Sequence, residues 1–256
     1  MEWDLNLKGK SVLITGGRRV GGDLAQRLAD RGASIAMTFH TRPEPIEATL
    51  KAVRDKGVST FSVAADLSRP EQAEKAVAET VAAFGRLDVL VNMASVYRRT
   101  PFADLRSSDF DAMMAANLAA PYHTSVAAAR AMRGKPTNPD ELQGKIVTVG
   151  DWATDRPYKD YLPYLVAKGA LKTMTQALAR ELAPDITVNL VQPAMIDPPL
   201  DLSEADRAEI VAQTPLRRVG TAGDLNRLIL YLLEGTDFAT GSCYRVDGGR
   251  FLGRDS

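Results

Sequence analysis

Short apolar runs alternate with longer stretches of helical periodicity along the whole chain. Runs that are apolar almost throughout are typical of strands in a parallel sheet buried on both faces. Seven runs predict strands: Ser11–Thr15, Ser34–Phe39, Thr60–Ala64, Val89–Asn92, Lys145–Val149, Thr187–Gln192 and Ser242–Val246. The pattern indicates an α/β protein.

The longer stretches have apolar positions spaced three and four residues apart. This spacing places one apolar stripe on each helix, and such a stripe packs on a sheet. Three stripes stand out, from Ala73 to Phe84, from Leu171 to Leu182 and from Leu225 to Leu232. Alternating strands and helices with right-handed crossovers predict a Rossmann-type doubly wound sheet of seven parallel strands, flanked by helices, in a single domain spanning residues 1–256.

A Pro-rich segment at residues 193–203 follows the sixth predicted strand. Ligands of open parallel sheets bind beyond the carboxyl ends of the strands. We therefore predict a substrate loop at about residues 193–215 that closes over the ligand. An ordinary surface connection is an equally good interpretation of this segment.

Composition narrows the classes of function. The 256 residues include 32 Lys and Arg against 32 Asp and Glu, so there is no basic footprint for nucleic acid or anionic lipid. No apolar stretch approaches the ~18 residues of a membrane span, and the first residues lack the apolar run of a secretory signal. The single cysteine, Cys243, cannot form an internal disulfide. We expect a cytoplasmic protein that handles a small molecule, with no nucleic acid and no membrane partner.

The histidines do not predict a metal site. His40, His123 and Cys243 form no ligand set at a recognised spacing, so we expect no metal. The same residues offer no Ser-His-Asp or Cys-His arrangement, and other side chains must carry any chemistry.

A glycine-rich turn follows the first predicted strand. Its sequence, GGRRVGG at residues 16–22, leads directly into a helical apolar face. Glycines let the backbone approach a pyrophosphate, whose charge is met by the N–H groups and dipole of the helix N-terminus. A tight turn without a ligand is the alternative. The predicted dinucleotide contacts in this turn are Gly16, Arg18, Arg19, Val20 and Gly21.

The end of the second predicted strand bears on the choice of cofactor. An NAD enzyme usually places a carboxylate there for the ribose hydroxyls, and a carboxylate would repel a 2′-phosphate. This chain has Thr38–Arg42 instead, and its next carboxylate is Glu44. His40 and Arg42, with the two arginines of the glycine-rich turn, supply positive surroundings for a 2′-phosphate. We therefore predict NADPH (NADP) as the cofactor.

Tyr164 and Lys168 are one helical turn apart, so both side chains leave the same face of the helix that carries Leu171. An ammonium group near a phenol favours the phenolate and lowers its pKa. The pair therefore predicts a tyrosine that donates and accepts protons near neutral pH.

The order of these motifs resembles the short-chain dehydrogenase/reductase family, and the resemblance runs from Lys10 to Gly249. It is carried by the turn at residues 15–22, Asp66-Leu67, Asn92-Met93-Ala94-Ser95, Asn117, the Tyr164 and Lys168 pair, Pro193-Ala194 and Val246-Asp247-Gly248-Gly249. The family implies one nicotinamide-binding domain in a homotetramer.

The resemblance also implies roles for individual residues. Tyr164 would be the acid and base, Lys168 would bind the nicotinamide ribose, and Asn117 would hold a water in the proton relay. The further cofactor contacts that it implies are Asp66, Leu67, Asn92, Ala94, Ser95, Pro193 and Ile196.

One position departs from the family pattern. Where the family usually has a serine ahead of the catalytic tyrosine, this chain has Asp151. An ionised carboxylate cannot donate to a ketone oxygen and repels a developing alkoxide, but it attracts an N–H group or, if held protonated, donates a proton. We therefore predict a nitrogen heterocycle with a reducible C=N bond as substrate. Two alternatives are that Asp151 caps the following helix or pairs with Arg156.

Aspartate at this position is similar to the pteridine reductase branch of the family. The turn at residues 15–21 resembles that branch's turn with one residue missing, and Phe39–Arg42 resembles its aromatic and basic NADPH loop. In the branch, an aromatic ring at the place of Tyr97 stacks on the pterin. The implied substrate contacts are Arg19, Ser95, Tyr97, Asp151 and Tyr161.

Three arginines have no role that the branch assigns. Arg98, Arg99 and Arg156 have the charge to receive the glutamyl carboxylates of a folate, although loop arginines more commonly face solvent. We keep both interpretations at this point.

The function predicted from the sequence is the NADPH-dependent transfer of hydride to a C=N bond of a pterin, dihydropterin or dihydrofolate-like ring. One alternative is a carbonyl reductase of the 3-oxoacyl or sugar/alcohol type. The other is a catalytically silent NADP(H)-sensing module, against which the intact Asn117, Tyr164 and Lys168 argue.

Overall fold

The seven predicted strands form one sheet in the computed structural model, which describes residues 6–17, 20–134, 141–198 and 202–253. All neighbouring strands are parallel, in the order β3-β2-β1-β4-β5-β6-β7. The strands are β1 (Ser11–Thr15), β2 (Ser34–Phe39), β3 (Thr60–Ala64), β4 (Val89–Asn92), β5 (Gly144–Val149), β6 (Ile186–Pro193) and β7 (Cys243–Val246). The predicted Rossmann-type doubly wound sheet is confirmed.

The strand boundaries agree with the predicted ones except toward the C-terminal half. β5 begins one residue earlier, at Gly144, because that residue pairs with Ile186, the first residue of β6. β6 extends to Pro193, which pairs with Val246 at the end of β7. Pairing between strands, which the run of apolar residues does not report, sets these ends.

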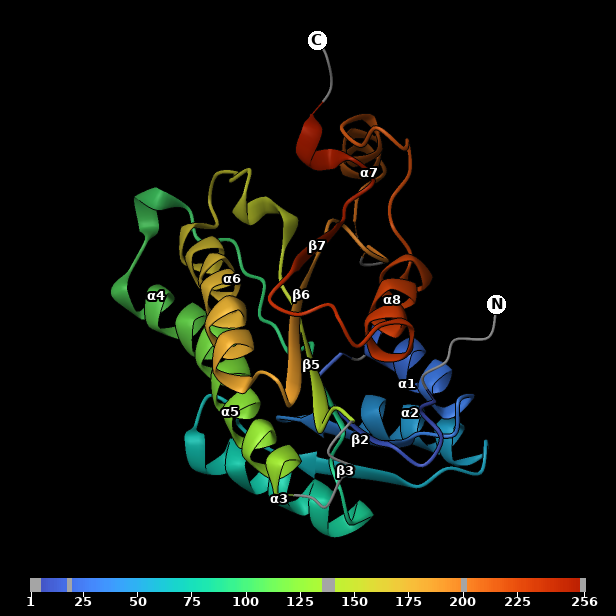
Figure 1. The fold of residues 1–256 in the computed structure, drawn as a ribbon. Coiled ribbons are helices and arrows are strands. Elements are labelled where there is room, and N and C mark those ends of the chain that lie inside the picture. Colours follow the sequence, from blue (N-terminus) through green and yellow to red (C-terminus); the bar gives the residue numbers. More distant parts are fainter. Residues whose placement is uncertain (1–5, 18–19, 135–140, 199–201, 254–256) are drawn as a thin grey trace.

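Helices cover both faces of the sheet (Figure 1), and alternate residues of the strands face the two layers. Val12 and Ile14 of β1 pack in the cluster that includes residues of α1, α2 and α8, whereas Leu13 packs with residues of α3, α5 and α6. The helices are α1 (Val20–Ala29), α2 (Glu44–Arg54), α3 (Pro70–Phe84), α4 (Ser107–Met114), α5 (Ala120–Arg133), α6 (Leu162–Leu182), α7 (Glu204–Ala212) and α8 (Ala222–Leu230).

Five short helical segments connect these elements or extend them. Three are 3₁₀ turns and two are π-helical, and they are η1 (Phe102–Asp104), η2 (Ala115–Ala119), η3 (Trp152–Thr154), η4 (Tyr231–Gly235) and η5 (Arg250–Leu252). Two of them, η3 and η5, lie beyond the carboxyl ends of β5 and β7, and they therefore sit at the edge where a parallel sheet binds ligands.

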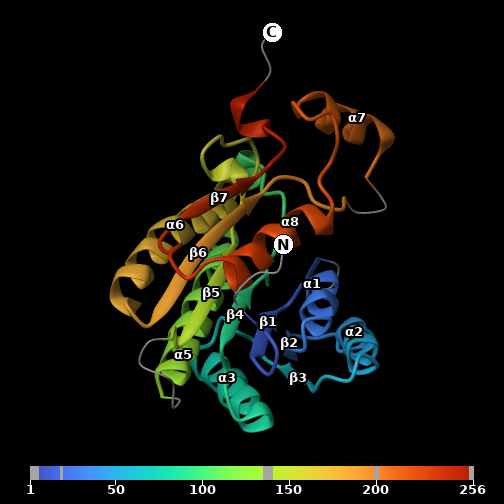
Figure 2. The ribbon, with the colours of Figure 1, turned by 45° about the vertical axis from the view of Figure 1, so that its right-hand side comes forward.

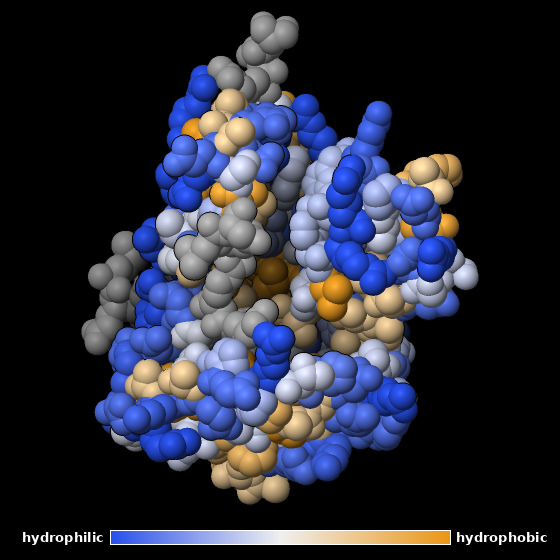
Figure 3. All heavy atoms as spheres, turned by 180° about the vertical axis from the view of Figure 1, so that it is seen from behind, coloured by the Kyte–Doolittle hydropathy of each residue, from blue (hydrophilic) through white to orange (hydrophobic). Residues whose placement is uncertain are grey.

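The strand order reverses between β1 and β4, and the turns that follow these two strands are joined. The hydroxyl of Thr15 accepts hydrogen bonds from the backbone N–H of Met93, at 3.1 Å, and of Ala94, at 3.2 Å. A crevice between diverging turns is expected at such a reversal. Seen from behind (Figure 3), the mostly polar surface is hollowed near its centre, and apolar atoms show at the floor of the hollow.

The segment predicted as a substrate loop at residues 193–215 contains a helix. Ser203 caps α7 by accepting a hydrogen bond from the N–H of Asp206 at 3.0 Å. Figure 2 shows α7 standing away from the sheet, above α8. The part of the chain that the structure describes contains no helix long and apolar enough to cross a membrane.

A buried carboxylate joins the amino ends of two central strands. Asp88 is 5% exposed and accepts bonds from Ser11 N at 2.9 Å and from Arg86 Nε and Nη2 at 2.8 and 2.7 Å. We expect Asp88→Ala to lower the free energy of unfolding by about 2–3 kcal/mol, because a buried N–H loses its acceptor. Urea denaturation measures this loss.

Glu74→Ala is the matched control, because Glu74 pairs with Arg130 at 3.4 Å on the surface, where both side chains are largely exposed. We expect a change within about 0.5 kcal/mol for this variant. Equal losses in the two variants would contradict the structural role given to Asp88.

Candidate active site

A tyrosine, a lysine and an aspartate meet at the carboxyl end of β5. Tyr164 and Lys168 lie on one face of the first turns of α6, and they are 4% and 3% exposed. The Tyr164 hydroxyl donates to Oδ2 of Asp151 at 2.6 Å, and Lys168 Nζ donates to the backbone oxygen of Val149 at 2.9 Å. Residues distant in the sequence therefore form one hydrogen-bonded group.

Asp151 has two structural tasks. Its backbone is extended after β5, and its Oδ1 accepts a hydrogen bond from Ala153 N at 2.8 Å, which caps η3. Its Oδ2 accepts the Tyr164 proton. The capping alternative considered from the sequence thus holds together with the contact to the tyrosine, while Arg156 bonds elsewhere.

Burial controls the charges of this group. Burial raises the pKa of Asp151, and the hydrogen bond from Tyr164 offsets part of that rise. Burial and the neighbouring Asp151 carboxylate raise the pKa of Tyr164 well above its ordinary value. Burial lowers the pKa of Lys168 to about 8. The sequence predicted a lowered pKa for Tyr164, and the direction in the structure is the opposite. Burial and the Asp151 carboxylate outweigh the effect of the Lys168 ammonium group, whose Nζ lies 5.9 Å from the centroid of the Tyr164 ring.

Asn117 lies in η2, the π-helical segment between α4 and α5. Its Oδ1 accepts bonds from Ser95 Oγ at 2.7 Å and Val96 N at 3.1 Å, and its Nδ2 donates to the backbone oxygens of Val96 and Met113. A π-bulge often marks a functional position in a helix. Asn117 thus holds the loop after β4, which carries Tyr97, against α4.

Tyrosine side chains surround the Tyr164 ring. Tyr97 stacks on Tyr161 with centroids 4.5 Å apart and lies edge-on to Tyr164 at 5.0 Å. The Tyr158 hydroxyl donates to that of Tyr97 at 3.2 Å. Tyr97 is 53% exposed, so the predicted aromatic pair lies beside the acid/base candidate and is open to a ligand.

The glycine-rich turn fits the backbone of a nicotinamide dinucleotide site. Gly16 has φ +60°, and a Cβ there would lie 2.9 Å from Ala94 Cα; Gly17 has φ +78°. Gly21 and Gly22 lie in the first turn of α1 and are buried. The close approach leaves no room for side chains between the turn and the end of β4, as a pyrophosphate cradle requires. The predicted contacts Arg18 and Arg19 lie outside the described residues, whereas Val20 begins α1.

The end of β2 lies beside the end of β3, where Asp66 is found. Ser68 donates to Asp66 through its N–H and its hydroxyl, and these bonds, with a smaller effect of the His40 charge, lower the pKa of Asp66. His40 and Arg42 are exposed, and neither is ion-paired within the described residues. An imidazole and a guanidinium are thus available where a 2′-phosphate is expected.

The other predicted cofactor contacts lie at the same edge of the sheet, with one exception. Asn92 is buried, and its Oδ1 has no hydrogen-bond partner among the described residues. Pro193 ends β6, and Ile196 pairs with Gly220. The Leu67 side chain instead packs in a core cluster and is 6% exposed, so only its backbone is available to a ligand.

The arginines singled out from the sequence are engaged elsewhere. Arg98 pairs with Asp109 at 2.5 Å and Arg99 pairs with Asp160 at 2.5 Å. Arg156 donates to the backbone oxygens of residues 250 and 251 in η5. These contacts give the three arginines structural partners.

An arginine that the sequence motifs did not single out faces the site in the described part of the chain. The guanidinium carbon of Arg250 lies 5.0 Å from the ring centroid of Trp152, the residue after Asp151. Its signal in the sequence is slight: a basic residue directly after the Asp247-Gly248-Gly249 turn.

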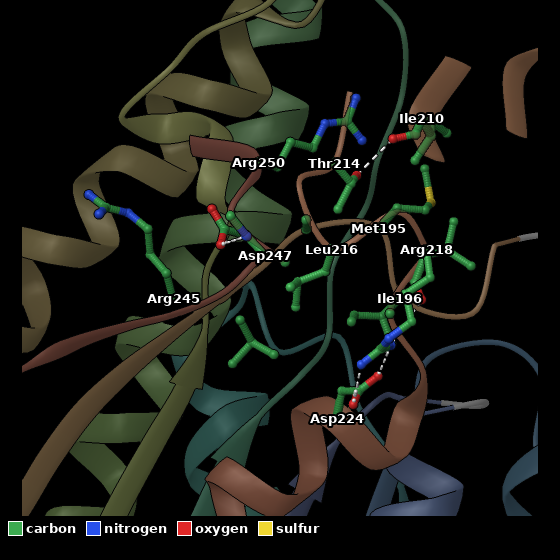
Figure 4. A pocket seen from close by; sticks show the side chains of 16 residues that line it. Met195, Ile196, Ile210, Thr214, Leu216, Arg218, Asp224, Arg245, Asp247 and Arg250 are labelled. Atoms are coloured by element: carbon green, nitrogen blue, oxygen red, sulfur yellow. Dashed lines mark hydrogen bonds and ion pairs between the residues drawn. The ribbon is translucent and has the colours of Figure 1, made fainter. Parts of the chain in front are cut away.

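Arg250 lines a cavity of about 340 Å³ beside the turn after β6 (Figure 4). Residues from that turn, from the segment after α7 and from the β7–η5 connection line it, and they include Ala194, Ile196, Thr214 and Arg250. Ala194 also packs in the cluster that contains Tyr164 and Trp152, so the cavity and the catalytic candidates share a wall. The described residues hold no cluster of metal-ligating side chains.

Comparison with known proteins agrees with this geometry. A family model described as enoyl-(acyl carrier protein) reductase matches residues 17–250. The chain belongs to the short-chain dehydrogenase/reductase family. A ketoacyl reductase of the granaticin polyketide synthase from Streptomyces violaceoruber is 34% identical over 249 residues, which cover 94% of this chain and 96% of that protein. The 3-oxoacyl-acyl-carrier-protein reductase FabG of Escherichia coli K12 is 30% identical, with 97% and 100% covered.

Solved structures of short-chain dehydrogenase/reductases superpose closely. One from Serratia marcescens is 31% identical with a TM-score of 0.86, and the match covers 96% of this chain and 99% of that one. NAD⁺-bound xylitol dehydrogenase is 27% identical with a TM-score of 0.85, with 95% and 99% covered. The two ketoacyl reductases and the xylitol dehydrogenase are named for carbonyl or alcohol substrates, and they favour the carbonyl reductase alternative over the pterin prediction.

The pH dependence of turnover tests the electrostatics of this dehydrogenase/reductase site. Reduction should decline as the pH rises through about 8, where Lys168 loses its proton. The Asp151 charge raises the pKa of both Lys168 and Tyr164. We therefore expect Asp151→Asn to move the alkaline limb of kcat/KM to lower pH.

Asp185→Asn is the control, because Asp185 pairs with Arg133 at the other end of β6. Its pH profile should match that of the wild type. An alkaline limb that stays in place, or moves upward, in Asp151→Asn would show that Asp151 does not set these pKa values.

Proposed function

We propose that the chain is an NADPH-dependent carbonyl reductase of the 3-oxoacyl type. The observation that carries the proposal is the buried Tyr164 hydroxyl, which keeps its proton beside Asp151 and Lys168 at the carboxyl end of β5. The ketoacyl reductases among the relatives support this substrate class.

Bound NADPH would supply the hydride to the carbonyl carbon. Tyr164 would donate its proton to the oxygen as negative charge develops there, because a phenol of raised pKa is fully protonated at neutral pH. Lys168, held by the Val149 carbonyl and largely charged below pH 8, would stabilise the tyrosinate left behind. Asp151, whose Oδ2 accepts the Tyr164 hydroxyl hydrogen bond, would hold the proton donor in place until the substrate oxygen takes over that hydrogen bond.

A second candidate is the C=N reduction predicted from the sequence. Asp151 favours it, because an ionised carboxylate accepts a hydrogen bond from a ring N–H. The exposed Tyr97 ring beside Tyr164 also suits a planar heterocycle. A silent NADP(H) sensor is disfavoured by the assembled Tyr164, Lys168 and Asp151 group.

Turnover with paired substrates separates the two candidates. We expect NADPH to be oxidised faster with an acetoacetyl thioester as substrate than with dihydrobiopterin. Tyr164→Phe should reduce the rate about 10²–10⁴-fold, because the proton donor is removed. Asp151→Ser should keep carbonyl reduction and lose any pterin reduction. Activity confined to the pterin would overturn the carbonyl proposal and support the second candidate.

NADPH preference rests on the end of β2. His40 and Arg42 are exposed there, and the residues between the end of β2 and Glu44 include no carboxylate. We expect Arg42→Ala to weaken NADPH binding about tenfold, because one charge-assisted hydrogen bond to the 2′-phosphate is lost, while NADH binding stays unchanged. Cofactor fluorescence titration measures both affinities, and an equal effect on NADPH and NADH would contradict the assignment.

We further propose a cytoplasmic homotetramer, as the family resemblance implies. An apolar groove between α4, η2, α5 and α6 supports association, and its lining includes Met114, Leu118, Tyr122, Met174 and Leu178. Sedimentation equilibrium measures the assembly, and a monomer at all concentrations would exclude it.

A further inference from the structure

Arg250 is a half-buried cation beside the active site. Its Nε is buried and has no hydrogen-bond partner among the described residues. Its Nη2 donates to Gln213 at 3.1 Å, and the guanidinium lies over the Trp152 ring. Burial lowers the pKa of Arg250, and the nearby Tyr158 and Glu209 offset part of that change. A charged donor of this kind is costly to leave without an anion.

The turn that carries Arg250 is fixed before any ligand arrives. Asp247 accepts bonds from Gly249 N and Phe251 N, both at 2.9 Å. Gly249 has φ +84°, and a Cβ there would lie 3.0 Å from Pro215. Arg156 donates to the backbone oxygen of Arg250 at 3.3 Å. The guanidinium therefore projects from a rigid base.

The other arginines of the adjoining cavity have carboxylate partners. Arg218 pairs with Asp224 at 2.6 Å, and Arg245 pairs with Asp155 at 2.7 Å (Figure 4 shows the first pair). Among the described residues, Arg250 has no such partner within ion-pair distance, although it lines the same cavity. One guanidinium at this wall is thus available to an anion.

The groups around Arg250 place it between the catalytic candidates and α7. Asp151, Tyr97 and Tyr158 near the catalytic candidates, and Glu209 of α7, are all close enough to interact with the Arg250 charge. In Figure 4 the Arg250 side chain extends toward the same end of the cavity as Thr214. A substrate whose reacting carbon faces Tyr164 would extend its remaining groups toward Arg250.

We propose that Arg250 binds an oxyanion of the substrate, a carboxylate or a phosphate, and so determines specificity for anionic substrates. The planar guanidinium matches such an oxyanion through two parallel hydrogen bonds. The identity of the reacting group rests on the proposed function, but the binding of the anion does not. The positive charge also offsets Asp151, which otherwise repels an anionic substrate.

A binding experiment tests the oxyanion site without turnover. Malonate, and separately inorganic phosphate, is titrated into the NADP-loaded protein by calorimetry. We expect Arg250→Met to weaken binding of at least one of them about 10- to 100-fold, with Arg250→Lys in between, because a charge-assisted pair of hydrogen bonds is lost. NADP affinity and thermal unfolding measured on each variant show that the fold and cofactor site are intact.

Arg227→Met is the matched control, because it removes the same charge as Arg250→Met. Arg227 is exposed on α8 and does not line the cavity. It should bind both anions as the wild type does. Absence of binding to the wild type, or equal weakening in Arg227→Met and Arg250→Met, would overturn the proposal. If the wild type binds the anion but does not reduce a carbonyl substrate, only the proposed function is contradicted.

Two substrate pairs identify the source of the oxyanion. Acetoacetate against its ethyl ester tests a carboxylate, and acetoacetyl-coenzyme A against the neutral N-acetylcysteamine thioester tests a phosphate. We expect Arg250→Met to lower kcat/KM about 10- to 100-fold for the charged member of one pair and to leave the neutral member nearly unchanged. Equal losses for both members of each pair would show a structural role and overturn the proposal.

Discussion

Burial of the sheet on both faces is the constraint on which the rest of this structure depends. Val12 and Ile14 of β1 face one helical layer, and Leu13 between them faces the other. Polar side chains within such strands need partners, as Lys145 and Asn189 find in backbone oxygens, because a buried polar group without a partner is costly. The chemistry therefore collects where the strands end, and parallel pairing brings all those ends to one edge.

At that edge, burial also sets the protonation of the reactive groups. The same desolvation favours a neutral Tyr164, disfavours a charged Asp151 and lowers the pKa of Lys168. The Tyr164 hydroxyl donates to Asp151, and the raised pKa of the phenol means that it keeps its proton there. A carboxylate where the family usually has serine is therefore compatible with proton donation from the tyrosine.

Among the residues that the structure describes, the arginines near the site divide into those that build its walls and one that faces it. Arg98 and Arg99 tie the loop after β4 to α4 and to Asp160, and Arg156 fixes the turn of η5. Arg250, held by that turn, brings a positive charge toward the buried Asp151. The positive charge of Arg250 thus offsets the negative charge of Asp151, which stands where the family usually has serine.

The sequence alone determined the sheet, its helices and the edge of the sheet at which the candidate site lies. Apolar periodicity is a property of each segment by itself, and the order of strand, glycine turn and helix fixes which residues reach the shared edge. The Tyr164 and Lys168 pair could also be predicted, because both lie on one helix. Their pKa values could not, since burial arises from segments far away in the sequence.

Tertiary structure decided which way the remaining side chains turn. The π-helical turn at Asn117, the stacking of Tyr97 on Tyr161 and the pairing of Arg99 with Asp160 all depend on contacts between separate loops. Arg250 shows the reason most clearly: nothing in its neighbours in sequence places it over Trp152. Local patterns specify elements, whereas the partners of a charged or aromatic side chain are set only when those elements pack together.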